Sequence, residues 1–110
     1  MTRAEHLLTI AVEEAAEVTQ RVCKAQRFGL QQVQQDADDK PEQNPMRLTN
    51  QERIQEEFAD LVAVLEMIDP GLVTVTSMQI AAKRDKVERY LCRSERCGTL
   101  APAAGEEPSK

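Results

Sequence analysis

Two carboxylate clusters with the same spacing are the residues of this chain best suited to chemistry. They occupy residues 13–17, Glu-Glu-Ala-Ala-Glu, and residues 56–60, Glu-Glu-Phe-Ala-Asp. Acids three positions apart lie on one side of a helix. If two helices bring the clusters face to face, their oxygens form a site for a hard divalent cation such as Mg²⁺. Such a site indicates phosphate chemistry.

Each cluster lies beside an apolar stripe with helical spacing. The stripes are Leu8, Ala11, Ala15, Val18, Val22 and Ala25, and Ile54, Phe58, Leu61, Leu65 and Ile68. At about 100° per residue, the first acid of each pair lies roughly 60° from the middle of its stripe and the second roughly 120°. The predicted metal ligands are therefore Glu14, Glu17, Glu57 and Asp60. Four such carboxylates would raise one another's pKa without a cation. The alternative is a charged helix face that is only solvated.

Basic and aromatic side chains complement these acids. The candidates for substrate binding are Lys83, Lys86, Arg89 and Tyr90 in a later segment, and Arg21, Lys24 and Phe28 after the first cluster. Cationic groups hold phosphate oxygens, and aromatic or guanidinium groups stack on nucleobases. The alternative is that the cations suit a helix dipole or extend along the surface.

Helix signals position both clusters. Thr2 with Glu5 forms a capping box that predicts a helix to about Phe28, where Gly29 ends it. Thr49 with Glu52 predicts a second helix. Residues 30–48 are predicted to form a polar connector, with a short helix around 31–35 as the alternative.

The second half of the chain predicts one more long helix. Asp-Pro-Gly at 69–71 ends the second helix, and residues 72–76 are expected to form a turn because no partner strand is available. Ser77 is the predicted cap of the last helix. The expected fold is an all-α bundle of three long helices plus an optional short fourth, over residues 1–95, with a disordered tail over 96–110.

Composition excludes several classes of function. A net charge of −5 argues against direct nucleic-acid binding, and no apolar run approaches the roughly 20 residues of a membrane span. Three cysteines without a Cys-x-x-Cys pair support neither a disulfide framework nor zinc, and favour a cytoplasmic location. The single histidine, His6, forms no Glu-x-x-His pair of the di-iron type and no recognisable catalytic triad. There is also no P-loop pattern.

The chain resembles the MazG-like all-α nucleoside triphosphate pyrophosphohydrolases, the superfamily that includes the dimeric dUTPases and dCTP pyrophosphatases. The resemblance rests on residues 13–17, 56–60 and 83–90, with a further similarity to small phage and bacterial members at 24–29. Together these segments cover most of residues 5–92. The lack of Trp and the scarcity of other aromatic residues depart from the family pattern and leave the base-binding wall undefined.

The resemblance implies cleavage of an NTP or dNTP between its α and β phosphates. Mg²⁺, or Mn²⁺ as a substitute, would bind the four acids named above, and Glu13 or Glu56 would support this shell or orient water. Lys83, Lys86 and Arg89 would hold the phosphates, and Tyr90 would stack or hydrogen-bond. A homodimer or homotetramer is implied. Two alternatives stay open: a non-enzymatic helical interaction protein, and a nucleotide-binding regulator without significant turnover.

Overall fold

The structure, a computed structural model, describes residues 1–33 and 41–101 of the chain. Within them the chain forms α1 (Arg3–Phe28), a short 3₁₀ helix η1 (Pro41–Gln43), α2 (Asn50–Met67) and α3 (Ser77–Arg96), and no strand. The predicted all-α class and the three long helices are confirmed. Residues 31–33 are not helical, and the rest of the alternative short helix lies outside the described residues, as do positions 102–110 of the predicted tail.

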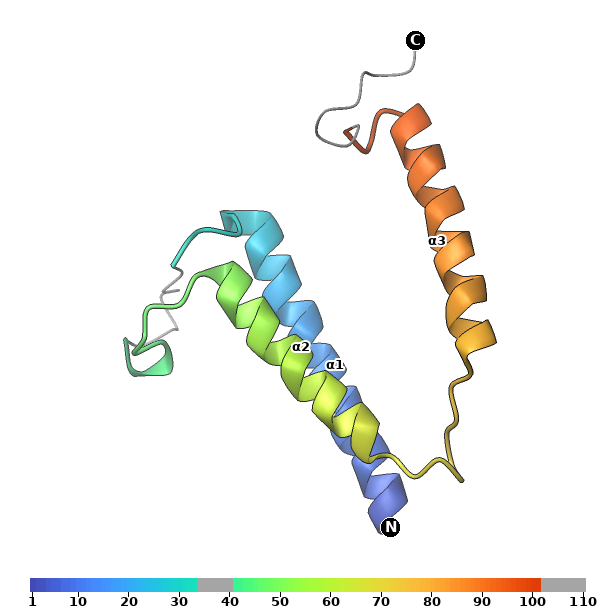
Figure 1. The fold of residues 1–110 in the computed structure, drawn as a ribbon. Coiled ribbons are helices and arrows are strands. Elements are labelled where there is room, and N and C mark those ends of the chain that lie inside the picture. The colour runs from blue at the N-terminus through green and yellow to red at the C-terminus, as the bar shows by residue number, and fades with distance from the viewer. Residues whose placement is uncertain (34–40, 102–110) are drawn as a thin grey trace. The chain divides into compact units, whose positions relative to one another are not determined.

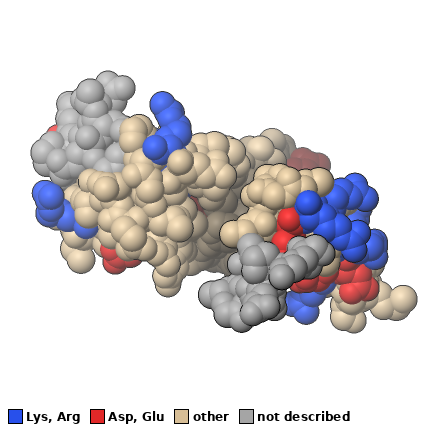
Figure 2. Space-filling view, turned by 90° about the horizontal axis from the view of Figure 1, so that it is seen from above, with Lys and Arg blue, Asp and Glu red and all other residues tan. Residues whose placement is uncertain are grey.

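The chain divides into two compact units, Met1–Val73 and Thr74–Lys110. The first unit holds α1 and α2, which lie side by side and antiparallel (Figure 1). The second holds α3, where no residue is buried and acidic and basic side chains are interleaved (Figure 2). No helix in the described part of the chain is long and apolar enough to span a membrane.

The first two helices begin and end as the sequence predicts. At the start of α1, the Thr2 side chain accepts from the Glu5 backbone while the Glu5 carboxylate accepts from Thr2. Gly29 ends the helix with a φ of 103°, a conformation that side chains rarely adopt. Thr49 and Glu52 form the same capping box at α2, and their hydrogen bonds lower the pKa of Glu52.

The predicted cap of α3 is wrong by one residue. The N-cap is Thr76, whose side chain accepts from the Gln79 backbone N–H, while the Gln79 side-chain oxygen accepts from the Thr76 backbone N–H. A cap at Ser77 would place Ile80 at the third helical position, and its side chain has no acceptor with which to complete the box.

The packing face of α1 keeps most of the predicted stripe, which is at least half-buried except at Ala15, but is rotated slightly toward Glu14. Ala15, in the middle of that stripe, is exposed, whereas Glu14 and Arg21 are half-buried and Leu7 is buried. The two residues of α1 that are buried, Leu7 near its start and Ala25 near its end, are both apolar. Glu14 therefore lies at the contact between the two helices, whereas Glu17 is exposed at its edge.

The packing face of α2 is rotated in the same sense. Phe58 and Leu65, predicted to face the core, are 48% and 51% exposed. Glu57 and Val64 are half-buried instead, and Arg53 is buried. Phe58 and Leu65 are thus left on the surface, while two charged groups join the packing face. The rest of the predicted stripe stays at least half-buried, namely Ile54, Leu61 and Ile68.

The connection between α1 and α2 is fixed by hydrogen bonds around Asn50, whose side chain is 1% exposed. Its Nδ2 donates to the Gly29 carbonyl and its backbone N–H donates to Gln32, both at 2.9 Å. The Gln51 N–H donates to Leu30, also at 2.9 Å. These bonds hold the end of α1 against the start of α2, which sets the register of the two acid clusters.

Replacing Asn50 should therefore destabilise the first unit. Asn50→Ala leaves the Gly29 carbonyl only the longer bond of 3.4 Å from the Gln32 N–H, and we expect a loss of about 1–3 kcal/mol in the free energy of unfolding. Urea denaturation followed by circular dichroism measures it, with Gln55→Ala, an exposed position of α2, as the control. Equal stability of the two variants would contradict the role given to Asn50.

Candidate metal centre

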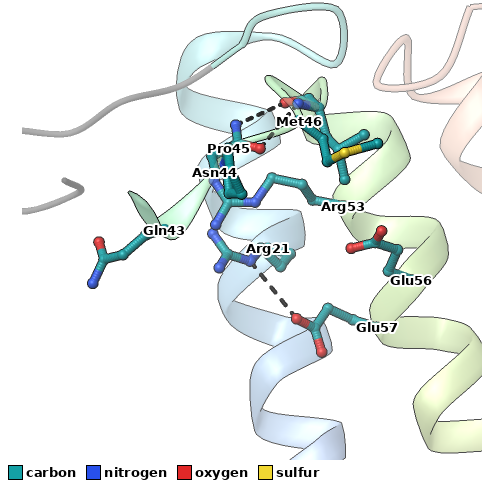
Figure 3. Close-up of a pocket in the computed structure, with 9 residues that line it drawn as sticks. Arg21, Gln43, Asn44, Pro45, Met46, Arg53, Glu56 and Glu57 are labelled. Carbon is teal, nitrogen blue, oxygen red and sulfur yellow. Dashed lines mark hydrogen bonds and ion pairs between the residues drawn. The ribbon is translucent and has the colours of Figure 1, made fainter. Parts of the chain in front are cut away.

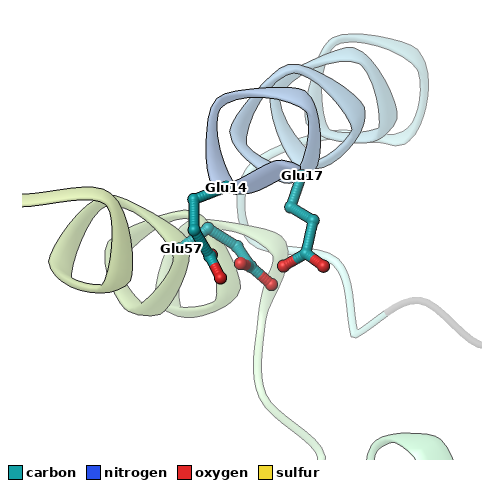
Figure 4. Close-up of side chains that lie close together, drawn as sticks. All are labelled: Glu14, Glu17 and Glu57. Atoms are coloured by element: carbon teal, nitrogen blue, oxygen red, sulfur yellow. The ribbon is translucent and has the colours of Figure 1, made fainter. Parts of the chain in front are cut away.

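Three carboxylates from two helices meet at the contact between α1 and α2. Glu14 and Glu17 extend from α1 and Glu57 extends from α2, with their carboxyl groups directed to one place (Figure 4). One oxygen from each lies within 4.8 Å of the others. The antiparallel packing thus brings together three of the four predicted ligands, although Glu57 follows Glu17 by 40 positions in the sequence.

The inner oxygens of this group have no hydrogen-bond partner. Oε2 of Glu14 and Oε2 of Glu57 are both enclosed by protein and accept no hydrogen bond in the described structure. A buried acceptor left unpaired costs about 1–3 kcal/mol, and more when it is charged. A cation between the helices would pair with both oxygens.

The pKa values reflect this crowding. Burial, a hydrogen bond with Glu17 and the charge of Glu17 raise the pKa of Glu57 to about 7, while the Arg21 charge opposes the rise. The pKa of Glu14 is also raised, first by burial and then by the charges of Glu17, Asp60 and Glu13. Two carboxyl groups can share a hydrogen bond only through a proton, so a proton takes the place that a cation would fill.

The remaining predicted acids surround the three. Asp60 is exposed and lies outside the group, but its charge raises the pKa of both Glu14 and Glu57. Glu13 is exposed and acts on Glu14 through its charge. Glu56 is exposed and lines a neighbouring pocket. Asp60 therefore acts on the group through its charge without joining it, and Glu56 lines the pocket beside it.

A pocket of about 300 Å³ adjoins the carboxylates (Figure 3). The loop after η1 forms one wall, where the Asn44 side chain donates to the Leu48 carbonyl and accepts from its N–H. Guanidinium groups come from α1 and α2, and Arg21 Nε lies 3.9 Å from Glu57 Oε1. The lining residues are Arg21, Gln43, Asn44, Pro45, Met46, Leu48, Arg53, Glu56 and Glu57.

Arg53 is a residue that the sequence analysis missed. It is 7% exposed and lies one helical turn before Glu57, on the same face of α2. The predicted apolar stripe excluded it, because that stripe was centred on Phe58 and Leu65. The spacing from Glu57 was the available signal, since a cation four positions before an acid shares its side of a helix.

The other predicted substrate-binding residues lie on the last turns of α1 or belong to the second unit. Lys24 is half-buried on α1, and Phe28 is 47% exposed with the Arg27 guanidinium 5.4 Å from its ring centre. On α3 the Lys86 ammonium lies 5.8 Å from the Tyr90 ring centre. The four candidates on α3 are all exposed, namely Lys83, Lys86, Arg89 and Tyr90. Their part in the site stays a prediction.

Comparisons with protein-family models, curated proteins and solved structures find no match to this chain. Its function must therefore be inferred from its own residues. The donor set at the α1–α2 contact consists of oxygen atoms only, which suits Mg²⁺, Mn²⁺ or Ca²⁺ and does not suit the softer metals.

The raised pKa of Glu57 predicts a pH dependence for the metal-free protein. Its pKa lies near 7 when folded, above its ordinary value of 4.5, so the folded state binds the proton more tightly. This contribution to stability is complete below about pH 4.5 and is lost as the pH rises through 7. Melting temperature in a chelating buffer from pH 5 to 8 should fall accordingly, and Glu57→Gln should flatten the fall. Glu66→Gln, an exposed acid of the same helix, is the control and should leave the slope unchanged.

Proposed function

We propose that this protein is a Mg²⁺-dependent nucleoside triphosphate pyrophosphohydrolase of the MazG-like type. It would cleave an NTP or dNTP between the α and β phosphates, with water as the second reactant, to give the monophosphate and pyrophosphate. The observation that carries the proposal is the meeting of Glu14, Glu17 and Glu57, with enclosed and unpaired oxygens on two of them. Water does not reach these enclosed oxygens, so a divalent cation bound between them would be their partner.

The residues present have distinct parts in this proposal. Glu14, Glu17 and Glu57 would hold the cation, with Asp60 completing the set from the exposed side. The chemistry that Mg²⁺ supplies when bound is neutralisation of charge on the phosphates and activation of a water molecule. Glu13 or Glu56 would orient that water, and Glu56 is favoured because it lines the adjoining pocket.

Assembly into a dimer or tetramer is part of the same proposal. The strip of α2 formed by Phe58, Val62 and Leu65 is 48–51% exposed, and the three residues share one side of the helix. In the described part of the chain, the buried apolar residues are Leu7, Ala25 and Ile68. A chain of this size gains stability by burying such a strip against a second copy.

Activity should depend on the carboxylates in a defined way. Purified protein incubated with the common ribo- and deoxyribonucleoside triphosphates and Mg²⁺ should release pyrophosphate, and chelation should abolish the release. Glu57→Ala and Asp60→Ala should each lower kcat/KM at least about 100-fold, because each removes charge from the cation site. Glu66→Ala should retain activity.

Three outcomes of that assay bear on the proposal. Turnover that survives both substitutions, with the helical fold intact, contradicts the site. Nucleotide binding with Mg²⁺ but without pyrophosphate release would identify a nucleotide-binding regulator instead. Absence of both binding and a Mg²⁺-dependent thermal shift would identify a helical interaction protein.

The assembly has its own test. Sedimentation equilibrium should give a mass of two or four chains, and Leu65→Glu should lower it, because the substitution places a charge on the apolar strip. Ala63→Glu adds the same charge at an exposed position on another side of α2 and should leave the mass unchanged. A wild-type protein that sediments as a single chain at micromolar concentration contradicts this part.

A further inference from the structure

The pocket beside the carboxylates combines two cationic side chains with two acids. Arg21 reaches it from α1 and Arg53 from α2, while Glu56 and Glu57 lie along the α2 wall (Figure 3). Its volume of about 300 Å³ is at the small end of ligand sites. A compact, charged ligand fits this space better than a whole nucleotide does.

Arg21 is held near Glu57 but is not satisfied by it. The 3.9 Å between Arg21 Nε and Glu57 Oε1 exceeds the length of a hydrogen bond. Its Nη1 is enclosed by protein and donates no hydrogen bond in the described structure. A guanidinium keeps its charge at any pH that proteins experience, so this donor needs an acceptor. An oxyanion in the pocket supplies one.

Arg53 adds a second fixed positive charge at low exposure. Only 7% of the residue is exposed, and it lines the pocket together with Arg21. One planar guanidinium group can donate two parallel hydrogen bonds to two oxygens of a phosphate. Arginine is therefore preferred where phosphate is recognised. Two such groups from facing helices therefore form a cradle for a phosphate chain.

The charge balance of the pocket changes when a cation binds to the neighbouring carboxylates. When they are ionised, Glu56 and Glu57 offset the charges of Arg21 and Arg53. A divalent cation held by Glu57 with Glu14 and Glu17 occupies one of those two acids. The pocket then carries excess positive charge, so anion binding and cation binding favour each other, by the same factor in both directions.

We propose that this pocket binds the phosphate chain of the substrate through Arg21 and Arg53, directly beside the carboxylate cluster. The identity of the anion as a nucleotide phosphate rests on the proposed function; the anion pocket itself rests on the two guanidinium groups. Phosphate binding is thereby assigned to residues of the first unit, in addition to the α3 lysines that the family resemblance implies.

Calorimetric titration with inorganic pyrophosphate tests the pocket without any need for turnover. In excess Mg²⁺ the wild-type protein should bind pyrophosphate saturably, and at least about tenfold more tightly than in chelating buffer. Arg21→Gln and Arg53→Gln should each weaken binding by about 10- to 100-fold, the range expected for losing a hydrogen bond to a charged group. Arg3→Gln, an exposed arginine near the start of α1, should bind as the wild type does.

Two measurements keep the test decisive if Arg53→Gln fails to fold. Arg53→Lys keeps the charge but loses the planar fork, and it should weaken binding less than the glutamine variant of Arg21 does. In the wild-type protein, the assigned Nε–Hε signals of Arg21 and Arg53 should shift on addition of pyrophosphate with Mg²⁺. Saturable binding that leaves both signals unmoved overturns the proposal.

The outcomes separate this inference from the proposed function. Pyrophosphate binding that depends on both arginines supports the pocket even if no nucleotide is hydrolysed, and in that case only the proposed function fails. Mg²⁺-dependent nucleotide hydrolysis whose KM is unchanged in both arginine variants overturns the pocket and leaves the proposed function standing. Absence of pyrophosphate binding by the wild-type protein also overturns the pocket.

Discussion

Repulsion among carboxylates at the α1–α2 contact is the constraint on which the rest of this structure depends. Glu14, Glu17 and Glu57 bring oxygens within 4.8 Å of one another, and two of the three, Glu14 and Glu57, are half-buried. Burial and mutual charge raise the pKa of Glu57 to about 7, so near neutral pH the group holds a proton or repels its neighbours. The Arg21 charge relieves part of this repulsion, and a bound cation would relieve the rest while leaving the carboxylates ionised. That makes the contact a functional candidate.

The surrounding elements serve this contact. Capping boxes at Thr2 and Thr49 fix where α1 and α2 begin, and the Asn50 side chain ties the start of α2 to the Gly29 carbonyl at the end of α1. Register between two antiparallel helices decides which side chains meet, so these local bonds determine that Glu14 faces Glu57. The Asn44 amide closes the loop that covers the arginine pocket. The same elements thus place the proposed cation site and the proposed anion pocket side by side.

Much of this arrangement could be predicted from sequence, because helix boundaries and acid spacing are local properties. The capping boxes located α1 and α2, and helical rotation placed Glu14 and Glu57 closer to the packing face than Glu17 and Asp60, as their burial bears out. The exact packing face could not be predicted, since an apolar stripe was assumed to face the core. Phe58 and Leu65 lie outward instead, and Arg53 lies inward, because contact between helices depends on both partners. The loop around Asn44 gave no periodic signal, and the part of α3 in the site stays a prediction.

The position of a bound cation tests the central claim most directly. Crystals grown with Mn²⁺, a spectroscopic and anomalous-scattering substitute for Mg²⁺, should show an anomalous peak about 2.0–2.3 Å from carboxylate oxygens of Glu14, Glu17 and Glu57. The enclosed oxygens of Glu14 and Glu57 should be among its ligands. A peak elsewhere, or no peak at saturating Mn²⁺ with these carboxylates still packed against one another, would contradict a metal centre at the α1–α2 contact.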